Sequence, residues 1–346
     1  MARDASDRPR SAPSSSATPL VVCSTAMLDV MRLVACYARA RTPVVLVGET
    51  GTGKGLIAKE LHRASGRSGP FVVLTAAELR GTLGADVLFG HAAGAFTGAA
   101  GRREGMLAQA AAGTLLIDDF HHLRAAQQIK LLRVLEEGWW RPQGADREVP
   151  VQLRVVVTLP RSPDALMRAG RLLPDIRYRL GNALVAIPRL AQRRDDIPVL
   201  AAHFLDQAPE ATGVPGGPGA FADGVSRLLQ LGDWPGNVRE LRDAVQIAYL
   251  HAGAEGSIEM EHLPASALGP LRYTKGGRSA RAIRGIELAL TLAQGNIARA
   301  ARLTGASRAT VYRTLAALER RPARPSHESC SIRRVTQTAR SQEASA

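Results

Sequence analysis

The stretch Val44–Gly55, VVLVGETGTGKG, decides the fold, because it sets a glycine-rich turn between an apolar run and an amphipathic segment. Gly48, Gly53 and Lys54 fit the spacing G-x-x-x-x-G-K of a phosphate-binding loop. Glycines let backbone N–H groups close around a phosphate, since no Cβ stands in the way. Lys54 would then reach the β- and γ-phosphates of a nucleotide at the N-terminus of the following helix.

The residue after Lys54 departs from the usual pattern of this loop. A Ser or Thr is expected there, whose hydroxyl would bind Mg²⁺, whereas this sequence has Gly55. A plain glycine-rich turn between a strand and a helix is the alternative interpretation. The candidate nucleotide-binding residues of the loop are Gly48, Glu49, Thr50, Gly51, Thr52, Gly53, Lys54 and Gly55.

Four apolar runs between about Leu20 and Asp196 predict the core: PVVLVG, PFVVLT, GTLLIDD and LRVVVTLP. They are continuous rather than alternating, which is typical of parallel strands buried on both faces. Amphipathic segments such as AAQQIKLLRVLEEG lie between them and predict helices. This order predicts a doubly wound α/β fold.

Two carboxylates end the run GTLLIDD. Ligands of doubly wound sheets bind outside the carboxyl ends of the strands. We therefore expect Asp118 to hold Mg²⁺ through water and Asp119 to polarise an attacking water. A solvated pair of aspartates at a strand end is the alternative, which the phosphate loop disfavours.

Three arginines are candidate phosphate contacts. The stretch DWPGNVRELRD begins a helix, in which Asn237 would be the N-cap and Glu240 would complete a capping box. Arg239 then lies in the first turn, where the helix dipole disfavours a cation unless a phosphate is near. In PDIRYRL, Arg177 and Arg179 share a face only in a strand. Either is a candidate phosphate contact for a neighbouring subunit, and a basic surface turn is the alternative.

The segment ALTLAQGNIARAARLTGASRATVYRTLAAL has two amphipathic stretches joined by LTGAS, which is typical of a helix-turn-helix. Ser307 would cap the second helix. From Leu271 to Ala346 the chain has 15 Arg plus Lys against 4 Glu, so this segment carries +11 of the net charge of +14. That charge favours nucleic acid over an ordinary helical hairpin or a solvated basic tail. The expected DNA contacts are Ser307, Arg308, Thr310 and Arg313.

Composition narrows the class of protein. The cysteines Cys23, Cys36 and Cys330 lack metal or redox spacing, which suits a reducing cytoplasm. No apolar run approaches the ~20 residues that span a bilayer. The opening MARDASDRPRSAPSSSATP lacks the apolar part of a signal peptide. We therefore expect a cytoplasmic protein with no membrane partner.

Six motifs together carry a family resemblance: GETGTGK, LFGHAAGAFTGA, GTLLIDD, RYRL…RRDDIP, WPGNVREL and GNIARAARLTGASRATVYR. From about Leu20 to Arg320 the chain resembles sigma-54-dependent transcriptional activators, also called bacterial enhancer-binding proteins. The resemblance implies an AAA+ ATPase with a parallel-sheet core, a helical lid and a Fis-type helix-turn-helix. The expected segments are a disordered lead at 1–19, the core at 20–196, the lid at 197–268, a linker at 269–285, the DNA-binding unit at 286–320 and a disordered basic tail at 321–346.

The resemblance also implies a role for GAFTGA, in a chain that is only 4% aromatic. In the family this segment is a mobile loop that contacts sigma-54, with Phe96 and Thr97 at its tip. An aromatic ring with no local packing partner agrees with that role. Burial of Phe96 under its own helix is the alternative. The implied sigma-54 contacts are Gly94, Ala95, Phe96, Thr97, Gly98 and Ala99.

The family assembles as a ring, usually a hexamer, that uses ATP and Mg²⁺ to remodel sigma-54 RNA polymerase holoenzyme. The implied partners are that holoenzyme, upstream enhancer DNA and further subunits of a homo- or hetero-oligomeric ring. Arg239 would be the sensor arginine of the lid and Arg179 the arginine finger. About 20 residues precede the core, which leaves no room for the family's common receiver domain. We therefore expect control by expression or by a separate protein.

Five positions depart from the family pattern. Gly55 replaces an acidic residue, and Asp119 replaces the catalytic Glu with a side chain one methylene shorter. The remaining three are Thr75, Pro160 and Leu173, which replace an Asn partner of that Glu, a sensor Asn and the first finger arginine. Because each change removes or shifts a group that acts in phosphoryl transfer, we expect them to lower the rate of hydrolysis. The alternative function is a DNA-binding subunit with weak or absent ATPase activity in a mixed ring.

Overall fold

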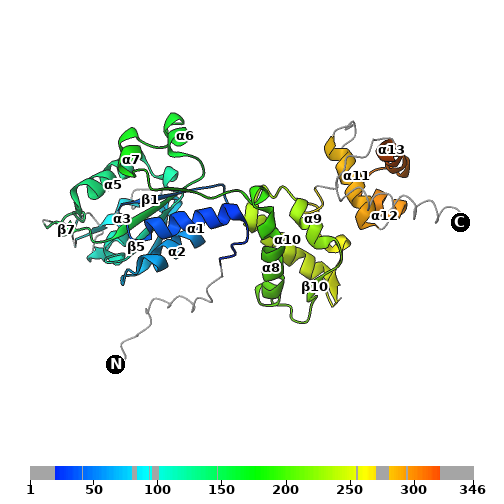
Figure 1. Cartoon of the computed structure of the whole chain (residues 1–346). Coiled ribbons are helices and arrows are strands. Elements are labelled where there is room, and N and C mark those ends of the chain that lie inside the picture. The colour runs from blue at the N-terminus through cyan, green and yellow to red at the C-terminus, as the bar shows by residue number, and fades with distance from the viewer. Residues whose placement is uncertain are drawn as a thin grey trace, which may run out of the picture.

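The computed structural model describes residues 20–40, 42–79, 84–92, 94–95, 101–145, 147–254, 256–269, 280–293 and 295–319. Figure 1 shows an α/β core, then a helical part, and beyond it a group of C-terminal helices on the side away from the core. The core and the adjoining helical part form the expected AAA+ arrangement of a parallel sheet with a lid.

The core sheet has five parallel strands in the order β2-β5-β8-β1-β9. Their bounds are β1 Val44–Val47, β2 Phe71–Thr75, β5 Thr114–Asp118, β8 Arg154–Leu159 and β9 Leu184–Ala186. The four apolar runs thus all form strands, which confirms the prediction. Every residue of β8 is buried because this strand lies in the middle, whereas β2 lies at an edge and Val73 is 47% exposed.

Helices cover both faces of the sheet. On β1, Val44 and Leu46 pack against α1 (Thr25–Ala38) and α2 (Lys54–Ser65), while Val45 packs in the cluster of the other face, as the period of a strand requires. That face carries α5 (Ala125–Glu137), which was predicted, and also α3 (Gly84–Phe89), α4 (Met106–Gln109), α6 (Pro163–Arg168) and α7 (Pro174–Arg179). Two short helical turns, η1 (Ala76–Leu79) and η2 (Phe120–His122), also belong to the core. So does a small antiparallel pair of strands, β6 (Trp139–Trp140) and β7 (Val149–Pro150).

A fully buried arginine joins the sheet to α1. Arg154 begins β8, and its guanidinium donates to the carbonyl of Ala38 at 2.5 Å and to that of Tyr37. The last carbonyls of a helix have no partner within the helix, so Arg154 satisfies the C-terminal end of α1. Burial lowers the pKa of Arg154 to about 10, so the side chain stays charged at neutral pH.

The lid consists of α8 (Ile197–Thr212), α9 (Val225–Leu231) and α10 (Asn237–Ala252), with a small sheet of β10 (Ala220–Phe221) and β11 (Ser257–Ile258). The stretch GVPGGPG forms the loop between α8 and β10, as predicted. Turns η3 (Leu190–Gln192) and η4 (Arg194–Asp196) connect the core to α8, and η5 (Met260–His262) follows β11. One apolar cluster holds these elements together.

The C-terminal group has three helices: α11 (Ala280–Leu292), α12 (Ile297–Thr304) and α13 (Arg308–Glu319). The sequence predicted α12 and α13, whereas α11 is an additional helix that begins inside the expected linker. Ala300, Val311 and Leu315 belong to one apolar cluster, in which α12 packs against α13. The Ser307 hydroxyl accepts from the Thr310 amide at 3.2 Å and so caps α13. No helix within the described ranges is both long and apolar enough to cross a bilayer.

Candidate functional site

A pocket of about 570 Å³ lies where the phosphate loop, the end of β5, the N-terminal segment and the lid meet. Residues Thr50–Gly55 line it together with Asp118, Asp119 and Arg239, so the structure brings most of the predicted nucleotide residues to one place. Gly48 and Glu49 do not line the pocket, but their carbonyl groups accept hydrogen bonds from Lys54, which does. The apolar part of the lining includes Leu20, Val21, Leu200 and Phe204.

Lys54 is held inside the phosphate loop. Its Nζ donates to the carbonyl of Gly48 at 2.8 Å and to that of Glu49 at 3.1 Å. An ammonium has three N–H groups, so one remains for a ligand. Burial lowers the pKa of Lys54, while the carboxylates of Asp119 and Asp118 raise it. An anion in the pocket would favour the charged form further.

The two aspartates share a hydroxyl that the sequence did not single out. Thr158 Oγ1 on β8 donates to Asp118 Oδ1 at 2.5 Å and accepts from the Asp119 amide at 2.8 Å. Asp119 has a φ of 53°, so the chain turns sharply after β5. Thr75 on the neighbouring strand pairs in register with Asp118. Thr158 thus orients both acidic residues at the carboxyl edge of the sheet.

The start of α10 differs from the prediction. Gly236, not Asn237, is the N-cap, and Glu240 accepts from the Gly236 amide at 2.7 Å. The buried Asn237 side chain points to the core instead: it accepts from the Leu190 amide at 2.8 Å and donates to the carboxylate of Glu49 at 3.1 Å. Tertiary contacts with the phosphate loop therefore replace the local cap.

The lid also contacts the phosphate loop through its backbone. The amide of Val238 donates to the carbonyl of Gly51 at 3.0 Å. Gly51 has a φ of 80°, and a Cβ there would lie 2.2 Å from the carbonyl oxygen of Gly236. Only glycine permits this approach. Arg239 follows in the first turn of α10 and lines the pocket.

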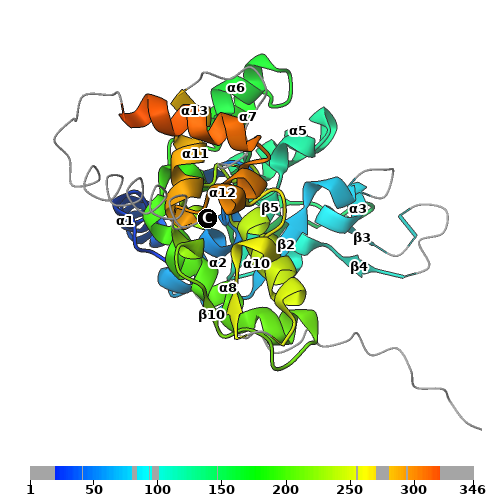
Figure 2. The same cartoon turned by 90° about the vertical axis from the view of Figure 1, so that its right-hand side faces the viewer.

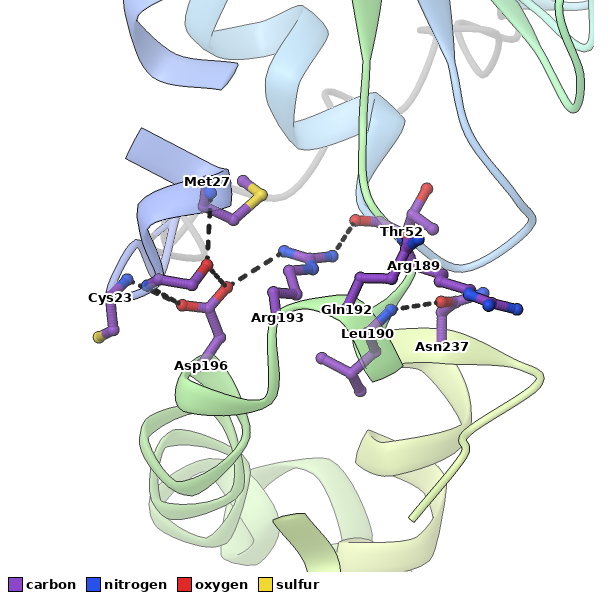
Figure 3. Close-up of polar contacts among 10 residues, drawn as sticks. Cys23, Met27, Thr52, Arg189, Leu190, Gln192, Arg193, Asp196 and Asn237 are labelled. Carbon is purple, nitrogen blue, oxygen red and sulfur yellow. Dashed lines mark hydrogen bonds and ion pairs between the residues drawn. The ribbon is translucent and has the colours of Figure 1, made fainter. Parts of the chain in front are cut away.

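Figure 3 shows a second connection between core and lid, which the sequence did not reveal. Arg193 Nη2 donates to the carbonyl of Thr52 at 2.7 Å, and Arg193 Nη1 lies 3.7 Å from Asp196 Oδ2. Both side chains are buried. Their motif, RRDDIP, has the composition of a charged surface turn, and no local signal marks which charges are internal.

The arginine-finger candidates lie in a helix, α7, so Arg177 and Arg179 do not share a face. Arg177 donates to Asp164 at 2.8 Å, and Arg179 donates to the carbonyl of Leu135 at 3.1 Å through Nε. Arg179 is exposed and does not line the pocket of its own chain. Leu173 is the N-cap of this helix. Pro160 directly follows β8.

Of the GAFTGA residues, Gly94 and Ala95 are described, whereas Phe96, Thr97, Gly98 and Ala99 lie outside the described residues. The segment follows β3 (Gly90–His91), which pairs with β4 (Arg103–Glu104) in the hairpin seen in Figure 2. The His91 ring contacts Asp86 through Nδ1 and the carbonyl of Gly101 through Nε2 at 2.9 Å. The contact with Gly101 joins the two ends of the segment.

The expected DNA-contact residues lie at the start of α13. Ser307, Arg308 and Arg313 are exposed, and Thr310 is half-buried. Arg313 Nη2 donates to Thr310 Oγ1 at 3.3 Å. Two cations and two hydroxyl groups therefore gather on the first turns of one helix.

Comparison with known proteins extends over nearly the whole described chain. The sigma-54 interaction domain matches residues 20–186, and the AAA+ ATPase lid domain matches residues 191–276. The transcriptional regulatory protein GlrR of Escherichia coli is 34% identical over 301 residues, which are 86% of this chain and 67% of GlrR. ZraR of Salmonella typhimurium is 36% identical over 312 residues, 88% of this chain and 70% of ZraR.

Solved structures of NtrX from Brucella abortus have the same fold. One has a TM-score of 0.68 and 28% sequence identity, and covers 87% of this chain and 70% of NtrX. Another, of NtrX in complex with ATP, has a TM-score of 0.64 at 28% identity and covers 86% of this chain and 69% of NtrX.

Proposed function

The chain belongs to the family of sigma-54-dependent transcriptional activators, and from this premise we propose that it binds and hydrolyses ATP to act on sigma-54 RNA polymerase. The observation that carries the proposal is one pocket that unites the phosphate loop with Asp118, Asp119 and Arg239. The ATP complex of NtrX, a protein of the same fold, supports ATP as the ligand.

The chemistry of the pocket suits a nucleoside triphosphate. The third N–H of Lys54, the loop amides and the N-terminus of α2 supply donors for phosphate oxygens. Arg239 adds a cation on the lid side, where a phosphate would offset its unfavourable place in the first turn of α10. Leu20, Val21 and Phe204 offer an apolar surface for the base.

Mg²⁺ would be held through water by Asp118, whose Oδ1 is oriented by Thr158. A bound Mg²⁺ neutralises phosphate charge during phosphoryl transfer. Asp119 would polarise the attacking water as a general base. Because Gly55 has no hydroxyl, Asp118 is the protein group proposed to reach the ion.

Arg179 is proposed to act on the nucleotide of a neighbouring subunit in a ring, as a hexamer or a mixed assembly. Its exposure and its place outside the lining of its own pocket agree with that role. The contact with the Leu135 carbonyl would then break on assembly. The C-terminal helices are proposed to form a helix-turn-helix that binds enhancer DNA through Ser307, Arg308, Thr310 and Arg313.

We propose that the GAFTGA segment contacts sigma-54 through Phe96. Replacing Phe96 with alanine is expected to reduce open-complex formation by about tenfold or more, since a buried aromatic contact is worth about 2 kcal/mol. ATP turnover should stay within about twofold, because the described residues of the segment, Gly94 and Ala95, do not line the pocket. The measurement is transcription from a sigma-54 promoter beside phosphate release. Intact open-complex formation in Phe96→Ala would refute the assignment.

The alternative function, a subunit with weak or absent ATPase activity, is favoured by Asp119. Its carboxylate is one methylene shorter than that of Glu, and a displacement of about 1 Å can cost about 100-fold in rate. On this alternative, Asp119→Glu should raise the turnover of the purified protein by about 10- to 100-fold. Turnover is measured against protein concentration, since a ring site needs neighbours. Robust turnover of the unmodified chain excludes the alternative.

A further inference from the structure

Two buried charged side chains connect three segments that border the pocket. Arg193 lies between the sheet and α8, and its guanidinium donates to the carbonyl of Thr52 in the phosphate loop at 2.7 Å. Asp196 stands at the end of the same turn, 3.7 Å from Arg193, and is 0% exposed (Figure 3). Arg193 also lines the pocket. The phosphate loop and the start of the lid are thereby joined.

Asp196 extends this connection to the N-terminal segment. Its Oδ1 accepts from the amides of Cys23 at 2.9 Å and Ser24 at 2.7 Å, and its Oδ2 accepts from the Ser24 hydroxyl at 3.1 Å. Leu20 and Val21, just before these residues, line the pocket. One carboxylate thus fixes the segment that supplies part of the apolar lining.

A gain in folding stability does not explain why this ion pair is buried here. A buried ion pair loses hydration, and an apolar pair of the same volume is often as stable or more so. Arg193 Nε has no hydrogen-bond partner in the described part of the chain, so the guanidinium is not fully compensated. The pair instead fixes positions: each contact holds one border of the pocket in place relative to another.

We propose that Arg193 and Asp196 are positioning residues for nucleotide binding, which hold the phosphate loop, the lid and the N-terminal segment in the arrangement that accepts ATP. The inference rests on the proposed function, because it takes ATP as the ligand. Neither residue needs to touch the nucleotide. Their effect is to prepare the pocket, so that binding does not have to order its borders.

Asp196→Asn tests the proposal, with Asp195→Asn as the matched control. Asp195 is the adjacent carboxylate and is exposed. Without the Asp196 charge, Arg193 is a buried cation with no counter-ion, and water would enter between the borders. The dissociation constant of ATP, measured by displacement of mant-ATP, is expected to rise by about tenfold or more in Asp196→Asn and by less than about twofold in Asp195→Asn.

The melting temperature, measured without and with ATP, separates positioning from mere stability. Asp196→Asn is expected to reduce the ATP-induced increase in melting temperature. A lower melting temperature with unchanged ATP affinity would overturn the inference. Should Asp196→Asn not fold, Arg193→Lys provides a milder variant. It keeps the charge but cannot contact both Thr52 and Asp196, and it is expected to bind ATP more weakly. Wild-type protein without ATP affinity would overturn the proposed function as well, whereas equal affinity of wild type and both variants would overturn the inference alone.

Discussion

Lys54→Ala is expected to weaken ATP binding by about 10- to 100-fold, because a charge-assisted hydrogen bond contributes about 1.5–3 kcal/mol. Lys54 Nζ lies in the phosphate loop with two of its N–H groups bonded to the carbonyls of Gly48 and Glu49. The backbone therefore aims the remaining N–H toward the pocket before any ligand arrives. Displacement of mant-ATP by ATP, followed by fluorescence, measures the loss.

Lys59→Ala is the control for this experiment. Lys59 lines the same pocket but is exposed at its rim, so its charge is screened by solvent. Its removal is expected to change the affinity by less than about threefold. Equal losses in Lys54→Ala and Lys59→Ala would show that only net charge matters, and the phosphate-loop assignment would have to be given up.

Arg154→Met is expected to lower the free energy of unfolding of the core by about 2–4 kcal/mol, since it removes the donor of the buried Ala38 carbonyl and one of the donors of the Tyr37 carbonyl. Arg154 is 0% exposed and bonds the carbonyls of Tyr37 and Ala38 at the end of α1. Relief of the buried charge offsets part of the loss, which is why the expected value is below that of the summed hydrogen bonds. Urea denaturation followed by circular dichroism measures the change.

The same substitution at Arg39 provides the comparison. Arg39 is the C-cap of α1 and is exposed, so Arg39→Met alters the same helix end without uncovering a buried polar group. Its effect is expected to stay within about 0.5 kcal/mol. If both variants are equally stable, Arg154 does not hold α1 to the sheet.

The core was predictable because its signals are local. Val44–Val47, the phosphate loop and Lys54 stand next to one another in the sequence, and continuous apolar runs mark the inner strands. The edge strand β9 was not predicted, since Leu184–Ala186 is too short to stand out and becomes a strand by pairing with β1. The additional helix α11 was not predicted because its first residues continue the basic composition of the expected linker.

The connections around the pocket were not predictable, because they join distant positions. Asp196 binds Ser24 across 172 positions, and Asn237 reaches Glu49 across 188. Asn237 has the residue type of a helix cap, and only the folded chain offers it a partner in the phosphate loop. Thr158 likewise gains its role from a neighbouring strand. Residues Phe96–Ala99 lie outside the described residues, so their sigma-54 contact stays a prediction.

Gly51 and Gly236 meet without a side chain between them, and this has a mechanical consequence. Neither residue has a side chain whose rotamer could absorb a small movement, so a shift of the loop is expected to move the start of α10. That helix has 16 residues, or about 24 Å at 1.5 Å per residue, and a tilt of about 5° would displace its far end by about 2 Å. A small movement of the phosphate loop would then become a larger movement at the far end of α10.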